Sequence, residues 1–283
     1  MKITQILLLI FISSVALGQT FSEEIDNIYN FQPSKLTDKE QELKMPSLDI
    51  FWSKVGGDTI HYLNQLRAEL RNTGHNPFFY YDGSGLLLSL TNSKADKELA
   101  IEAIAKCDLD DISQRVYVRT LNHLAKEGFD VTKPAIKILY AEKYSFFIPQ
   151  HAMVFNQGYC LTYMLVPQQN KFYIDTLIAI FKDLDTNAQK SVITTLWFAC
   201  DCKSDDFMET ISMDKNLPII VSDYAKRMIG YTQLSNDQKA YLNIIDKAQL
   251  QELRKSALSR FSDEAIDELD MTTRILRKQN KCH

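Results

Sequence analysis

The feature that most constrains the fold of this chain is the spacing of its apolar residues between residues 95 and 230. Apolar side chains recur there every three or four positions, which is the period of an amphipathic helix. The links between the periodic segments are short, about 3 to 8 residues, as in antiparallel helical arrays. Eight helices are expected, beginning near Ala95, Asp111, Pro134, Pro149, Phe172, Ala188, Ser204 and Pro218.

The scarcity of glycine and proline supports the same fold class. The chain contains 9 Gly and 7 Pro in 283 residues, whereas average usage would give roughly 20 and 14. A β-rich domain needs many tight turns, and tight turns use these two residue types. The sequence therefore predicts an all-α fold of stacked antiparallel helices, with extra helices at both ends.

One segment also carries a repeat-like pattern. Residues 214–225 read Asp-Lys-Asn-Leu-Pro-Ile-Ile-Val-Ser-Asp-Tyr-Ala, with an acidic residue, a proline entry and an alanine one turn later. Residues 108–124 carry a weaker form of it. Over about residues 95–230 the chain resembles HEAT-like and armadillo-like α-helical repeat proteins. The resemblance implies an α-solenoid-like stack of helix pairs with one continuous core, and it supplies no catalytic residues.

The first eighteen residues predict export. A basic start at Lys2 precedes an apolar run over residues 6–12, and the small residues Ala16 and Gly18 flank a cleavage site before Gln19. The apolar run is shorter than the roughly 20 residues that span a bilayer, and a lipid-anchored protein would have cysteine in place of Gln19. We expect cleavage near Gly18-Gln19, a periplasmic or extracellular location, and no stable membrane insertion.

The rest of the chain shows no low-complexity linker. Residues 19–283 are therefore predicted to form one continuous domain. Its parts would be N-terminal helices over 19–75, a helical repeat core over 76–230 and C-terminal helices over 231–283. The formal net charge is −4, and loss of Lys2 makes it −5. Because lysines and arginines form no cluster, we expect no nucleic-acid partner.

The five cysteines are Cys107, Cys160, Cys200, Cys202 and Cys282. An odd number leaves at least one thiol outside intramolecular disulfides. Cys107 and Cys160 lie in apolar helical contexts and are expected to be small core residues. On a helix, the side chains of Cys200 and Cys202 would point apart, and no second Cys or His pair completes a zinc site. We expect no metal, no cofactor, and a fold held mainly by helix packing.

The most unusual local sequence is the aromatic run over residues 78–81, followed by Asp82-Gly83-Ser84-Gly85. Either these rings pack in the core, which is favoured, or they form a shelf for a glycan or peptide. The Gly-Ser-Gly triplet lacks the glycine spacing of a nucleophile elbow. We expect a loop-to-helix junction with Asp82 or Ser84 as the N-cap, whose backbone N–H groups could bind an anion. The candidate ligand-binding residues here are Tyr80, Tyr81, Asp82 and Ser84.

A second group of candidates follows Pro149. His151 and Cys160 invite comparison with a thiol nucleophile and its base, but nine residues on a helix separate them by about 13 Å. Asn156 and Gln157 are flanked by apolar residues, so we expect buried amides that bond to a neighbouring helix's backbone. Ligand binding by His151, Asn156 and Gln157 is the alternative.

No motif in the chain is specific enough to identify a catalytic reaction. We therefore expect a non-catalytic, exported helical-repeat protein that binds a protein or peptide partner. One alternative is an exported helical hydrolase or lyase with a cleft near Tyr80, Tyr81, Asp82 and His151. That enzyme would need His151 in a pocket within hydrogen-bond distance of an Asp, Glu or Tyr. The other alternative is a structural subunit of a surface assembly.

Overall fold

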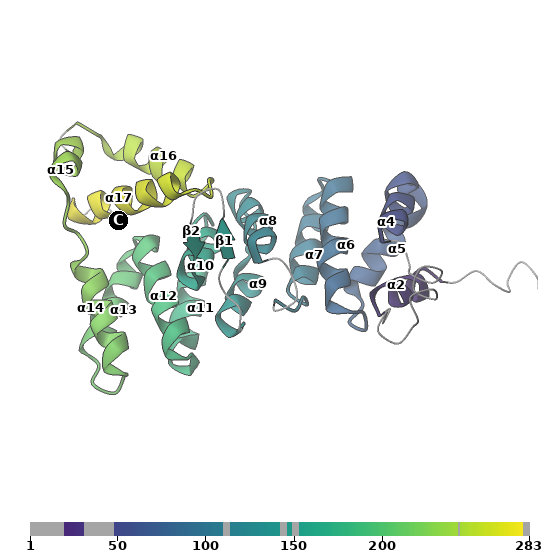
Figure 1. Cartoon of the computed structure of the whole chain (residues 1–283), viewed down its shortest axis with the longest axis horizontal. Coiled ribbons are helices and arrows are strands. Elements are labelled where there is room, and N and C mark those ends of the chain that lie inside the picture. Colours follow the sequence, from purple (N-terminus) through teal and green to yellow (C-terminus); the bar gives the residue numbers. More distant parts are fainter. Residues whose placement is uncertain are drawn as a thin grey trace, which may run out of the picture. The chain divides into compact units, whose positions relative to one another are not determined.

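The computed structural model describes residues 20–30, 48–109, 114–141, 146–148, 153–242 and 244–279. These residues form an all-α fold in which helices pack against their neighbours along the chain (Figure 1), as the apolar spacing predicted. The chain divides into two compact units, Met1–Asp108 and Leu109–His283. No described helix is both long and apolar enough to cross a bilayer. The predicted signal peptide lies outside the described residues.

The first unit is built on three mutually packed helices, α5 (Thr59–Arg71), α6 (Pro77–Leu90) and α7 (Lys94–Ile104). Two further helices, α2 (Phe21–Tyr29) and α4 (Leu48–Gly57), pack on α6, and α4 also packs on α5. Arg67 of α5 donates two hydrogen bonds of 2.8 Å to the Asp96 carboxylate of α7. This bidentate pair joins the first and last helices of the three-helix core.

Helix α6 begins earlier than the sequence predicted. The Asn76 side chain accepts a hydrogen bond from the Phe78 backbone N–H at 3.0 Å, and Pro77 occupies the first turn. The helix then runs without a break through Asp82 and Ser84. The predicted junction with Asp82 or Ser84 as N-cap is therefore wrong, because the Asn-Pro pair upstream already supplies a complete helix start.

The second unit contains eight described α-helices before its C-terminal pair. They are α8 (Gln114–Lys126), α9 (Thr132–Ile136), α10 (Gln157–Leu165), α11 (Phe172–Ile180), α12 (Thr186–Ala199), α13 (Cys202–Met213), α14 (Ile219–Gly230) and α15 (Asn236–Leu242). Short 3₁₀ turns, η2 (Lys137–Tyr140) and η4 (Phe181–Asp183), continue α9 and α11. The final pair is α16 (Lys247–Ala257) and α17 (Asp263–Lys278).

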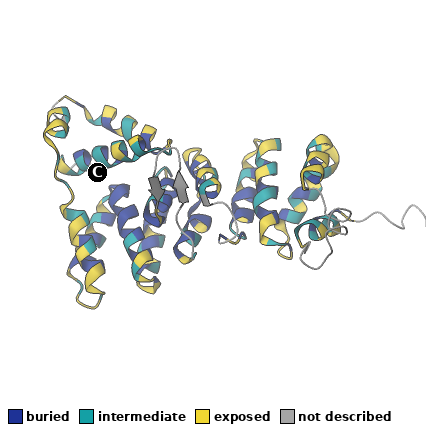
Figure 2. Cartoon of the chain, viewed as in Figure 1, coloured by how far each residue is buried: buried dark blue, intermediate teal, exposed yellow. Residues whose placement is uncertain are grey.

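Helix α12 forms the centre of this unit. Every residue from Ser191 to Ala199 is buried, and α12 packs against α10, α13 and α14 (Figure 2). Helix α10 is buried on nearly all sides as well. A helix that is apolar all round must lie inside a protein. The solenoid-like order of helices in this unit is therefore built around α10 and α12.

A short β-hairpin precedes α10. Strand β1 (Phe146–Ile148) pairs antiparallel with β2 (Met153–Phe155), with Phe147 opposite Val154. The helix predicted to begin at Pro149 begins instead at Gln157, where Asn156 is the N-cap. A short apolar run such as Met-Val-Phe fits a strand or a helix equally well, and the capping residue marks the helix start. The all-α prediction holds apart from this hairpin.

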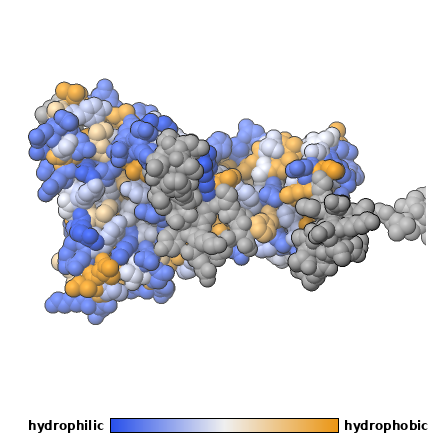
Figure 3. All heavy atoms as spheres, in the orientation of Figure 1, coloured by the Kyte–Doolittle hydropathy of each residue, from blue (hydrophilic) through white to orange (hydrophobic). Residues whose placement is uncertain are grey.

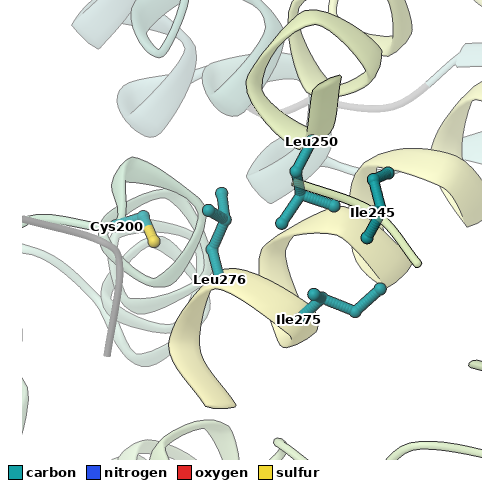
Figure 4. Close-up of a cluster of buried hydrophobic side chains, with 5 residues drawn as sticks. All are labelled: Cys200, Ile245, Leu250, Ile275 and Leu276. Carbon is teal, nitrogen blue, oxygen red and sulfur yellow. The ribbon is translucent and has the colours of Figure 1, made fainter. Parts of the chain in front are cut away.

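The helix pair α16–α17 packs over the C-terminal end of α12. Leu250, Ile275 and Leu276 cluster with Cys200, which follows α12 (Figure 4). Arg254 donates to the Phe198 carbonyl, and Arg277 donates to the Trp197 carbonyl at 2.6 Å and 3.1 Å. Cationic side chains stabilise the negative end of a helix dipole, so these two arginines attach the last two helices to α12.

The cysteines differ from the prediction at one position. Cys107 and Cys160 are buried and reduced, as expected of core residues, and Cys202 is reduced and exposed. Cys200, however, is disulfide-bonded. It lies beyond the end of α12 in a left-handed conformation with φ 54°. Helical geometry therefore does not describe the Cys200–Cys202 pair.

Candidate functional site

The candidate residues of α6 are packed into the first unit. Tyr80 is 2% exposed, and its hydroxyl donates to the Asn72 carbonyl at 2.9 Å while accepting from the His75 backbone N–H at 3.1 Å. Ser84 is fully buried and donates to the carbonyls of Tyr80 and Ala100. Both hydroxyls therefore serve backbone groups. Tyr81 is half-buried on the same helix.

Only part of the aromatic run is core. Phe79 and Tyr80 are buried, whereas Phe78 is 39% exposed. Because the run is helical, successive rings point about 100° apart instead of to opposite faces. The favoured interpretation, core packing, is confirmed for Phe79 and Tyr80.

Asp82 holds the C-terminal end of α2 on α6. Its carboxylate accepts a hydrogen bond of 2.9 Å from the Tyr29 hydroxyl. Burial raises the pKa of Asp82, and the bond from Tyr29 opposes that shift. Burial, followed by the charge of Asp82, raises the pKa of Tyr29 well above its ordinary value. The hydrogen bond between Tyr29 and Asp82 therefore holds α2 in position on α6.

A charged group in this unit surrounds His75, which lies in the link between α5 and α6. Its side chain is 2% exposed, and its ring lies between two carboxylates. Nδ1 is 2.9 Å from Asp26 of α2, and Nε2 is 2.7 Å from Glu69 of α5. The ring also meets that of Phe79 edge-on, with 4.9 Å between centroids. We call His75, Asp26 and Glu69 the His75 cluster.

Sequence reasoning had little chance of finding this cluster. Asp26 and His75 are 49 residues apart, and neither lies in a recognisable motif. The available signal was indirect. A polar residue next to the Asn-Pro helix start is well placed to meet the end of the preceding helix, which is where Glu69 lies.

The remaining candidates lie in the second unit. Asn156 is exposed, and its side chain accepts from the Tyr159 N–H at 3.1 Å as the N-cap of α10. Gln157 is buried, donates to the Ile138 carbonyl at 2.7 Å and accepts from the Ser191 hydroxyl at 2.6 Å. The predicted buried amide is confirmed for Gln157 and wrong for Asn156, whose role is capping. His151 lies outside the described residues.

A mixed polar and aromatic group on α12, α14 and α17 was not predicted. Thr194 and Tyr224 share a hydrogen bond of 2.8 Å. Arg274 lies 2.6 Å from Asp270 and stacks on the Tyr231 ring at 3.6 Å. Burial, followed by the charge of Asp267, raises the pKa of Asp270 to about 7. The contact between Arg274 and the Tyr231 ring ties α17 to the segment after α14.

The clearest solvent-facing apolar feature of the second unit is the junction of α13 and α14. Met213 is 72% exposed, Ile219 is 76% exposed and Ile220 is 50% exposed. We call these three residues the α13–α14 patch. The polar residues of the link, Asp214–Asn216, lie beside it in the chain. Hydrophobic side chains colour this end of the two helices in Figure 3.

Two further findings bear on function. Within the described residues, no three or more His, Cys, Asp and Glu side chains are grouped so that they could hold a metal ion. Comparison of the chain with protein-family models, curated proteins and solved structures gives no match. What the chain does must therefore be inferred from its own residues.

Proposed function

We propose that this chain is an exported, non-catalytic helical protein that binds a protein or peptide partner. The observation that carries the proposal is the α13–α14 patch. Three large apolar side chains face solvent within eight residues of sequence, beside a polar link. Exposed apolar groups with polar neighbours are typical of surfaces that bind other proteins. The candidate hydroxyls of Tyr80 and Ser84 bond to backbone carbonyls, which favours a structural role for them.

We also propose that the array is of the HEAT type over residues 95–230. In the second unit, α12 packs on both α13 and α14, which pack on each other, and α10 packs on α8 and α12. In the segment that carries the repeat-like pattern, α14 begins directly after Pro218 and buries Val221 and Ala225. In such arrays the links between helices face solvent and can vary in sequence. A partner site at the α13–α14 link agrees with this architecture.

Export can be tested on the mature protein. Its mass and N-terminal sequence, measured after expression in a secreting host, should show that it begins at Gln19. A mature chain that still carries residues 1–18 would contradict export by cleavage.

Binding can be tested with a matched pair of variants. The double variant I219S/I220S removes most of the α13–α14 patch, whereas I60S alters a side chain that is 96% exposed in the first unit. Both changes lie at exposed positions, so circular dichroism should show unchanged folding. A partner recovered in stoichiometric amount by crosslinking of the native protein should bind I60S normally. It should bind I219S/I220S about tenfold or more weakly, the loss expected from removing apolar contact area. Equal binding by all three proteins would contradict the proposed surface.

A further inference from the structure

The His75 cluster has a property that a purely structural contact does not need. An ionised carboxylate accepts hydrogen bonds and donates none, and a neutral imidazole has a single N–H. Both ring nitrogens of His75 face carboxylate oxygens, at 2.9 Å and 2.7 Å. Both contacts are satisfied only when both nitrogens carry a proton. We propose that protonation of His75 controls the docking of α2 on α5 and α6.

Helix α2 covers aromatic surface that its release would expose. Phe21 stacks on Phe51 of α4, with 5.6 Å between ring centroids. Tyr29 meets Phe79 of α6 at 5.8 Å and Trp52 of α4 at 6.4 Å. Undocking of α2 would therefore open an aromatic face on α4 and α6.

The other charged and titratable groups around the cluster are held by partners of their own. On α2 and α4, Glu24 pairs with Lys54 at 2.9 Å. On α6, Asp82 is bonded to Tyr29. After α7, Lys106 donates to the carbonyls of residues 70–72 and lies 4.8 Å from the Tyr80 ring centroid. The Ser22 hydroxyl donates to Glu69 at 3.2 Å. Of the groups that face the ring, Asp26 and Glu69 are the two that bond to it.

The direction of the effect follows from these contacts. When the His75 ring is an imidazolium, Asp26 of α2 and Glu69 of α5 both bind the same cation. With the neutral ring, one nitrogen presents a lone pair to a carboxylate, which is repulsive. Docking therefore needs a proton on both ring nitrogens of His75, and loss of either proton weakens it.

The test follows α2 by NMR in the isotope-labelled full mature chain between about pH 5 and about pH 9. Two signals report docking: the exchange protection of the α2 amides, corrected for intrinsic rates, and the Trp52 indole N–H resonance. We expect the protection to fall by about tenfold to a hundredfold across this range, as for loss of one charged hydrogen bond. The indole resonance should shift over the same range.

Two variants and a control decide the outcome. H75Q keeps one donor group and should remove the pH dependence of both signals. D26N should lower α2 protection in acid toward the wild-type level in base. H61Q alters a histidine on the exposed side of α5 and should behave as wild type. The proposal is overturned if α2 protection is independent of pH in the wild type, if H75Q keeps the wild-type transition, or if D26N changes nothing.

Discussion

At the residue scale, the pair of Arg67 and Asp96 is the strongest ionic contact of the first unit. Asp96 accepts both bonds from Arg67 and two more from the hydroxyls of Thr91 and Ser93, at 2.9 Å and 2.7 Å. The Arg67 guanidinium, aided by these hydroxyls, holds the pKa of Asp96 well below its ordinary range, against the effect of burial. A carboxylate with so many donors stabilises the fold only while it is ionised.

Replacement of this carboxylate tests that statement. We expect D96N to lower the free energy of unfolding by about 2 to 3 kcal/mol near pH 7, since it breaks charge-assisted bonds in a buried setting. A depressed pKa contributes stability above the ordinary aspartate value, about 4, and the contribution is lost as the pH falls below it. The gap between wild type and D96N should thus narrow by about 1 kcal/mol at about pH 3. Urea denaturation at the two pH values measures both effects.

The exposed pair of Asp223 and Lys226 provides the control. Lys226 Nζ lies 3.3 Å from Asp223 Oδ1, but both side chains are more than half exposed. Exposed ion pairs contribute little, so D223N should change stability by less than about 0.5 kcal/mol. If D96N and D223N lowered the free energy of unfolding equally, burial and multiple donors would not determine the strength of the Arg67–Asp96 pair.

Residue-scale prediction from sequence succeeded where the partners are local. The Ser-x-x-Gln spacing at Ser235 is typical of a capping box, and Ser235 and Gln238 exchange bonds of 3.2 Å and 3.0 Å. Asp58 and Ser262 are residue types that favour the N-cap, and each caps the helix that follows it. The His75 cluster was missed because its bonds join segments that are distant in sequence. Caps depend on a few adjacent residues, whereas buried ion pairs depend on tertiary placement.

At the element scale, two glycines show how tightly the helices approach one another. A Cβ at Gly158 of α10 would lie 3.1 Å from Thr194 Cβ of α12, so the two central helices are in close contact there. A Cβ at Gly85 of α6 would meet nothing within 4 Å. The first glycine is required by packing, and the second carries only the entropic cost of glycine in a helix.

Alanine substitutions should therefore have opposite effects at these two positions. We expect G85A to raise the free energy of unfolding by about 0.5 to 1 kcal/mol through helix propensity. G158A should lower it by about 1 to 3 kcal/mol, because Thr194 is β-branched and bonded to Tyr224, and so cannot move aside easily. Thermal unfolding of both proteins measures the signs. If G158A were also stabilising, the close approach of α10 and α12 would not be a constraint.

At this scale, the presence of a helix was the property best predicted from the sequence. Helices α11, α12 and α14 begin within two residues of the positions expected from the apolar spacing. The strand over Met153–Phe155 was predicted as helix, because three apolar residues carry no period of their own. The start of α6 was misplaced because glycines in the sequence suggested a turn, and packing against α5 overrode that local preference.

At the scale of the whole molecule, each of the two compact units contains stabilising contacts of its own. Arg67 and Asp96 lie in the first unit, and Gly158 and Thr194 lie in the second. The hydrogen bonds of Asp96 described above come from residues of the first unit, and the hydrogen bond of Thr194 joins it to Tyr224 of the second unit. Energetic effects at such sites should be independent, because distant changes without shared partners are additive. The sequence, which suggested one continuous domain, gave no indication of where such groups of contacts divide.

Additivity can be measured at each unit separately, since the chain has one tryptophan in each, Trp52 and Trp197. In urea, the indole resonances report the unfolding of their own surroundings. At each reporter, the double variant D96N/G158A should change the free energy of unfolding by the sum of the two single changes, within about 0.5 kcal/mol. The comparison pair R67A/D96N shares one interaction and should fall short of additivity by more than that amount. A large coupling between Asp96 and Gly158 would instead mean that the two units transmit packing changes to one another, and the separate treatment of their cores would fail.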